Sequence, residues 1–212
     1  MTDELVQGTL EWRMARVGFA TASRVCDIVK TNQNGKPSSK RAKYLDELVG
    51  ERLTGKPQDW KEVASLEARK AQEGDARAGY AFLTGLPVVE VGFIKHPVIE
   101  WAGCSPDGLV QKSGGIEIKA LDAANHFKLF DGRADEILDE YLPQVRFNLA
   151  CCAGRKWWDF VAFHAAAPPE MKLYIKRIER KEHELAISLL ESAVKDFLAE
   201  VDERVKRIRV GT

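Results

Sequence analysis

Two short segments hold the most informative residues of this sequence, SPDGLV at residues 105–110 and GIEIK at residues 115–119. The Asp-Gly pair at 107–108 is typical of a turn, and the Gly-Gly pair at 114–115 predicts a second break in the chain. The β-branched residues that follow predict a strand. A hairpin between the two segments would bring the aspartate of the first beside the glutamate of the second.

The second segment separates its polar and apolar side chains. Successive side chains of a strand point to opposite faces, so Glu117 and Lys119 share one face while Ile116 and Ile118 share the other. The isoleucine face can pack into a core, which leaves the polar face in a cleft beside Asp107. Two carboxylates so placed are suitable oxygen ligands for Mg²⁺, and the lysine could hold a metal-bound water or a phosphate. The same pattern also describes an ordinary antiparallel hairpin with Glu and Lys on its wet face.

The length and composition of the chain narrow its class. At 212 residues it suits one domain over residues 1–212, and such a chain buries roughly 70% of its unfolded surface. It shows no internal repeat, no signal peptide and no apolar run near the roughly 18 residues of a membrane span. We therefore expect a cytoplasmic protein without a membrane partner. No Cys-x-x-Cys pair occurs among the four cysteines, which argues against a zinc or redox motif.

Helical and extended patterns alternate along the chain and predict an α/β or α+β fold with a mixed central sheet flanked by helices. Helices are expected at residues 24–29, 42–53, 62–84, 123–131, 140–153 and 179–209. Strands are expected at residues 88–94, 101–104, 117–121, 156–163 and 171–178, with loops at 31–39 and 132–137. The last helix has an apolar stripe at helical spacing, formed by Ile187, Leu190, Val194, Phe197, Val201 and Val205.

The helix expected at 62–84 carries a carboxylate beside its apolar stripe. The stripe consists of Val63, Leu66, Ala76, Tyr80 and Leu83. Glu73 lies next to Ala76 and Tyr80 by helical spacing. Because an unpaired buried carboxylate is unfavourable, Glu73 either pairs with a basic group or serves near a metal ion.

Positive charge gathers near the N-terminus, although the whole chain has 32 basic and 32 acidic residues. Residues 13–43 contain eight Lys and Arg residues against a single Asp. Thr21 or Ser23 can cap the helix expected from residue 24, and hydroxyl and N–H groups beside Arg16 would form a phosphate-sized anion site. The alternative is a simple capped helix within a solvated basic surface.

Four motifs, in this order, resemble the lambda exonuclease (YqaJ-type viral recombinase) family of PD-(D/E)xK nucleases. They are RVGFATAS at 16–23, QEGDAR at 72–77, SPDGL with IEIK at 105–109 and 116–119, and YLPQV at 141–145. The resemblance spans nearly the whole chain and implies a restriction-endonuclease-like core.

The resemblance also implies a role for each matched residue. The metal ligands would be Asp107, Glu117 and Glu73. The attacking water would be oriented by Lys119 and Gln144, and the terminal 5′-phosphate of DNA would be bound by Arg16, Ser23 and Ser105. Trp12 matches a family tryptophan, for which we expect a packing role.

The implied activity is Mg²⁺-dependent digestion of double-stranded DNA from a 5′ end, with Mn²⁺ as the alternative ion. Mononucleotides would be released and a 3′ single strand would remain for recombination by strand annealing. Family members form a ring-shaped homotrimer and pass the product to a single-strand annealing protein, which the resemblance implies here as well. Two other functions stay open: an endonuclease of the same superfamily, and a non-catalytic DNA-binding module.

Overall fold

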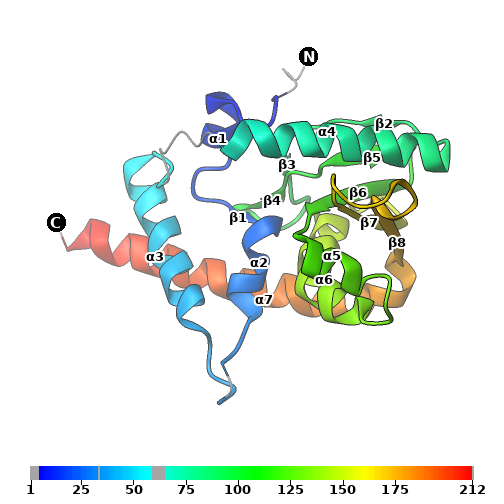
Figure 1. The fold of residues 1–212 in the computed structure, drawn as a ribbon. Coiled ribbons are helices and arrows are strands. Elements are labelled where there is room, and N and C mark those ends of the chain that lie inside the picture. The colour runs from blue at the N-terminus through cyan, green and yellow to red at the C-terminus, as the bar shows by residue number, and fades with distance from the viewer. Residues whose placement is uncertain (1–4, 33, 59–64, 212) are drawn as a thin grey trace.

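The protein is described by a computed structural model at residues 5–32, 34–58 and 65–211. Its centre is a mixed five-stranded sheet with helices over both faces (Figure 1). The strand order is β2-β5-β6-β7-β8, and only the β6–β7 pair is parallel. These strands are β2 (Val88–Val89), β5 (Gly108–Val110), β6 (Gly114–Ala120), β7 (Trp157–Phe163) and β8 (Leu173–Glu179). The predicted fold class, a mixed sheet flanked by helices, is confirmed.

A second, smaller sheet has the order β1-β4-β3 and contains β1 (Ala20–Thr21), β3 (Ile94–Lys95) and β4 (Ala102–Cys104). The prediction of one continuous strand at 88–94 was therefore wrong, because its two ends pair in different sheets. Gly92, between them, packs so closely against the backbone of Leu5 that a Cβ atom would not fit. The chain leaves one sheet at this contact and enters the other.

The helices occupy most of the expected segments, with shifted ends. They are α1 (Leu10–Ala15), α2 (Val25–Val29), α3 (Ser39–Thr54), α4 (Ser65–Thr84), α5 (Ala123–Lys128), α6 (Ala134–Cys151) and α7 (Arg180–Val210), with short 3₁₀ turns η1 (Ala22–Arg24) and η2 (Pro169–Met171). The loop expected at 132–137 was wrong in its second part, since α6 already begins at Ala134. Acidic residues in that first turn favour a helix start. The expected helix residues 62–64 lie outside the described residues.

The large sheet has an apolar core on each face. Strand β7 is buried along its whole length, as expected for a strand covered on both sides. On one face, Ile116 and Ile118 of β6 pack with Ala76 and Tyr80 of α4. On the other face, Trp158 and further residues of β7 pack with α6 and α7. The apolar face of β6 thus lies under α4, and its polar face lies towards α6.

Helix α4 is also fixed to the sheet by a buried polar group. Asp159 of β7 is 1% exposed and accepts a hydrogen bond from the Tyr80 hydroxyl at 2.7 Å. The Arg177 guanidinium donates to both oxygens of the same carboxylate, at 2.8 and 2.9 Å. Because each polar atom is paired, this network anchors the helix without leaving an uncompensated charge.

The long helix α7 packs as its apolar stripe predicted. All six stripe residues are buried: Ile187, Leu190, Val194, Phe197, Val201 and Val205. In α4, Ala76 and Tyr80 of the predicted stripe are buried, whereas Leu83, in the last turn, is 62% exposed. No helix in the described part of the chain is both long and apolar enough to cross a membrane.

The two glycines expected to break the chain instead belong to strand β6. Their missing side chains are replaced by tryptophan rings of the neighbouring strand, with Trp157 against Gly114 and Trp158 against Gly115. A Cβ atom on Gly115 would lie 2.5 Å from the Trp158 ring. Glycine therefore serves close packing between strands here, and it does not end the strand.

We expect Gly115→Ala to lower the free energy of unfolding by about 1–3 kcal/mol, because the fully buried Trp158 ring has to move. Denaturant unfolding measures this. As a control, Gly74→Ala in α4 has no atom within 4 Å of the new Cβ and should be neutral or stabilising by up to about 1 kcal/mol. Equal stability of Gly115→Ala and the parent protein would contradict the packing argument.

Candidate active site

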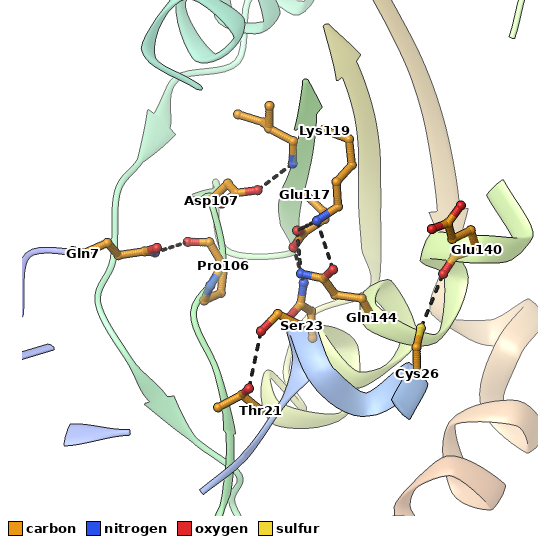
Figure 2. Close-up of polar contacts among 12 residues, drawn as sticks. Gln7, Thr21, Ser23, Cys26, Pro106, Asp107, Glu117, Lys119, Glu140 and Gln144 are labelled. Carbon is orange, nitrogen blue, oxygen red and sulfur yellow. Dashed lines mark hydrogen bonds and ion pairs between the residues drawn. The ribbon is translucent and has the colours of Figure 1, made fainter. Parts of the chain in front are cut away.

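The β5–β6 hairpin brings the two central carboxylates together. Gly108 pairs with Ile116, so the residues one step further out, Asp107 and Glu117, lie opposite each other. Oδ2 of Asp107 accepts a hydrogen bond from the backbone N–H of Ile118 at 2.6 Å (Figure 2). The predicted approach of Asp107 to the Glu117 strand is therefore present.

Glu117 is 2% exposed and lies beneath α6 rather than in an open cleft. Its Oε1 accepts hydrogen bonds from Lys119 Nζ at 2.8 Å and from Gln144 Nε2 at 2.6 Å. Its Oε2 accepts one from Asn148 Nδ2 at 2.8 Å. Lys119 also donates to Gln144 Oε1 at 3.0 Å, which closes a triangle of polar groups (Figure 2).

Helix α6 supplies both amides of this cluster. Gln144 and Asn148 are four residues apart, and side chains at that spacing lie on one face of a helix. Gln144 was predicted from the sequence, and Asn148 was not. The signal was available as the Gln-x-x-x-Asn spacing, but nothing in the sequence alone showed that this helix face lies over the polar face of β6.

Asp107 lies in a bend just before β5, where a turn was predicted, and this bend is held from two sides. Arg77 of α4 donates from Nη1 to the backbone carbonyl of Asp107 at 3.3 Å and forms an ion pair with Glu90 at 3.1 Å. Gln7 donates from Nε2 to the carbonyl of Pro106 at 2.7 Å (Figure 2). Neither residue was identified from the sequence. Both fix the backbone, so the direction of the Asp107 side chain is set before any ligand arrives.

Glu73 lies on α4 one turn before Arg77 and is half-buried. Burial raises the pKa of Glu73; the charge of Arg77 opposes this, and the charge of Glu117 adds to it. Glu73 is thus within electrostatic reach of the cluster. Among the described residues it has no hydrogen-bond partner, so its carboxylate remains available for a ligand.

The cluster has more negative charge than its own cation balances. Burial raises the pKa of Asp107 well above its ordinary value, and the nearby charge of Glu117 raises it further. Burial alone would lower the pKa of Lys119, but Glu117 and Asp107 outweigh this and raise it. Lys119 is therefore a cation here. Buried carboxylates that repel each other indicate a place for a further positive charge.

The donor set fits a hard divalent ion. Among the described residues no hydrogen bond reaches Oδ1 of Asp107, and Oε2 of Glu117 has one donor where two can bind. No three of the described His, Cys, Asp and Glu side chains already converge as a complete metal site. Mg²⁺ is commonly held by one or two carboxylates plus water and substrate phosphate, which these two can provide.

Two of the residues expected to bind phosphate are linked through Trp12. The Arg16 guanidinium stacks over the Trp12 ring at 4.1 Å, and the indole N–H donates to Ser105 Oγ at 3.0 Å. Trp12 therefore connects Arg16 to Ser105, beyond the packing role expected of it. The Arg16 guanidinium makes no hydrogen bond or ion pair with any described residue, which leaves its donors for an anion.

Ser23 reaches the same region through the small sheet. Thr21 of β1 pairs in parallel with Gly103 of β4, so the chain two residues further on brings Ser23 and Ser105 to the same end of the pair. Figure 2 shows Ser23 near Thr21, whose hydroxyl is 3.4 Å from its own. The predicted helix cap was wrong, since neither the Thr21 nor the Ser23 hydroxyl makes a capping hydrogen bond at the N-terminus of η1 or α2.

A cavity of about 150 Å³ opens beside Arg16. Its wall also includes Trp12, Arg24, Tyr44 and Glu47. Burial lowers the pKa of Arg16, with Tyr44 and Glu51 opposing, but an arginine remains charged at neutral pH. A partly buried, unpaired guanidinium facing a cavity is the arrangement that an anionic group would complete.

The amino-acid sequence was compared with models of known protein families. A family model described as the YqaJ-like viral recombinase domain matches residues 11–156, more than half of the chain. The chain belongs to this family. The matched range contains all eight residues that the sequence predicted for the two sites. A search of curated protein sequences finds no match.

Solved structures agree with this family. The chain is similar to an alkaline exonuclease, LHK-Exo, from Laribacter hongkongensis, with 36% identity, a TM-score of 0.82, and coverage of 96% of this chain and 97% of that one. A second structure of that enzyme, in complex with dAMP, gives 36% identity, a TM-score of 0.83 and the same coverage. A phage-related exonuclease from Haemophilus somnus 129PT shares the fold at 14% identity, with a TM-score of 0.67 over 91% of this chain and 96% of that one.

The raised pKa of Asp107 predicts a pH-dependent stability. A carboxyl whose pKa is higher in the folded than in the unfolded state binds its proton more tightly when folded. Its charged form therefore destabilises the fold, and stability is lost as pH rises from about 4, the ordinary Asp value, through the folded pKa.

We expect Asp107→Asn to remove this loss. The metal-free variant should be more stable than the parent protein at pH 7, because the amide carries no charge and its oxygen can still accept from Ile118. Unfolding at pH 4 and pH 7 without divalent ions measures it. A variant less stable than the parent at pH 7 would show that the negative charge of Asp107 does not destabilise the fold.

Proposed function

We propose that the protein is a Mg²⁺-dependent 5′-to-3′ exonuclease that acts on double-stranded DNA and releases 5′-mononucleotides. The general class, a DNA exonuclease of a recombinase family, follows from 36% identity to an alkaline exonuclease over 96% of the chain. The metal, the polarity and the duplex substrate are our proposal. The observation that supports it best is the position of Asp107, which precedes the Gly108–Ile116 pair and bonds to the strand of Glu117, with Lys119 bonded to that glutamate.

Each residue of the cluster has a chemical task under this proposal. Asp107 and Glu117 would hold the metal, with Glu73 assisting from α4. When bound, a divalent ion eases deprotonation of water and stabilises charge on a phosphate. The protonated Lys119 and the Gln144 amide would orient the water and the scissile phosphate, since together they offer donors and an acceptor.

The N-terminal site would recognise the end of the DNA. Arg16 supplies an unpaired guanidinium, and Ser23 and Ser105 supply hydroxyls at the end of the β1–β4 pair. Charge-assisted bonds from arginine suit a terminal phosphate. Because Ser105 and Asp107 are two residues apart, an end held at this site would lie beside the metal carboxylates.

The product and the assembly are proposed on the same basis. The similar enzyme LHK-Exo was solved with dAMP, a mononucleotide, which supports mononucleotide release here. Family resemblance further supports a homotrimeric ring around the DNA and transfer of the 3′ single strand to an annealing protein. The single-domain organisation and the cytoplasmic location stay predictions.

The competing activity is internal cutting by an endonuclease of the same superfamily. Covalently closed circular DNA separates the two, because it has no end to enter. We expect linear duplex DNA to be degraded with Mg²⁺ and the closed circle to remain intact. Linearisation or nicking of the circle at a comparable rate would favour the endonuclease.

We expect Lys119→Ala to reduce digestion of linear DNA by about 10²–10⁴-fold while DNA binding persists, because the lysine acts on the reacting groups. Lys112→Ala, on the exposed tip of the same hairpin, is the matched control and should retain activity. Release of mononucleotides and a binding assay in Ca²⁺ give the two readouts. Near-parental activity of Lys119→Ala would reject the assigned site.

A second experiment compares duplexes with 5′-phosphate and 5′-hydroxyl ends. The parent protein should digest the phosphorylated end faster, and Arg16→Ala should reduce this ratio by about tenfold or more, since a charge-assisted bond is lost. Lys43→Ala removes a positive charge from a 78% exposed side chain and should leave the ratio unchanged. An unaltered ratio in Arg16→Ala would show that this arginine does not recognise the 5′-phosphate.

A further inference from the structure

Asn148 is the most deeply buried polar side chain of the active-site cluster that no family motif accounts for. It is 1% exposed and comes from the middle of α6. The only hydrogen bond of its side chain among the described residues is the 2.8 Å bond from Nδ2 to Glu117 Oε2. Its own Oδ1 is buried and has no partner there.

Stability alone does not explain why an asparagine occupies this position. A buried amide normally has both its donor and its acceptor satisfied, and an unpaired buried acceptor destabilises the fold. An apolar side chain at this position would avoid the unpaired oxygen. What the amide provides, and an apolar residue would not, is one N–H aimed at Glu117.

The bond from Asn148 reaches Oε2 of Glu117, which is the carboxylate oxygen with room for a ligand. A carboxylate oxygen accepts about two hydrogen bonds, and Oε1 of Glu117 already receives Lys119 and Gln144. Oε2 receives Asn148 alone, so it is the oxygen with capacity left. Asn148 and Gln144 together hold the two oxygens from successive turns of one helix and thereby fix the plane of the carboxylate.

We infer that Asn148 is a positioning residue, which holds Oε2 of Glu117 in the direction of the divalent ion. This inference rests on the proposed metal site. Groups that orient a metal ligand without touching the ion typically change metal affinity by about 10–100-fold when removed.

The test is calorimetric titration of Mn²⁺ alone into the DNA-free protein, with thermal unfolding of the metal-free form in parallel. For Asn148→Leu we expect Mn²⁺ to bind about 10–100-fold more weakly. The unfolding temperature should change little, because the variant removes an unpaired buried oxygen but also leaves Oε2 of Glu117 without its donor. The matched control is Leu149→Ala, a buried neighbour on α6, which should lower the unfolding temperature and leave Mn²⁺ affinity unchanged. If Asn148→Leu does not fold, Asn148→Ala takes its place, with the same affinity loss expected.

Two results would overturn the inference. One is parental Mn²⁺ affinity in the Asn148 variant. The other is an equal loss of affinity in Leu149→Ala, which would mean that packing of α6 in general supports the site. Absence of Mn²⁺ binding by the parent protein is distinguishable from both, because it would reject the metal site of the proposed function together with this inference.

Discussion

The structure depends on holding two negative charges where water is largely excluded. Asp107 and Glu117 face each other across the β5–β6 hairpin, and one lysine is their cation within the cluster. Left to themselves, two such carboxylates would separate or take up a proton. They stay together because Arg77 and Gln7 fix the backbone around Asp107, while two amides and Lys119 hold Glu117, and burial together with the charge of Glu117 raises the pKa of Asp107. The fold therefore maintains an electrostatic imbalance that a divalent ion would relieve.

Strand β6 makes this possible by having two different faces. Its isoleucines pack beneath α4, which is anchored through Tyr80 and Asp159. Its polar residues lie beneath α6, which supplies amides instead of apolar side chains at the points of contact. A rigid apolar layer on one side thus supports a polar layer on the other. Catalytic groups built on such strands and helices are held more precisely than groups on loops.

The sequence predicted the elements that local patterns specify. Alternation along β6 correctly separated its isoleucine face from its polar face, although the burial of Glu117 beneath α6 was not predicted. Helical spacing along α7 identified its buried stripe, and the order of motifs identified the family. The larger errors came from long-range packing. Gly115 was interpreted as a chain break because its partner, Trp158, is far away in the sequence. The split of the strand expected at 88–94 depends on contact with Leu5. Asn148 was missed since its significance comes from the strand beneath it.

The central claim is that Asp107 and Glu117 share one divalent ion. Crystals of the protein soaked in Mn²⁺, measured at a wavelength where manganese scatters anomalously, test this most directly. We expect an anomalous peak about 2.0–2.3 Å from an oxygen of each carboxylate, as for a small divalent ion with oxygen ligands. A peak bound by only one of them, or a fully soaked crystal with no peak between the two, would contradict it.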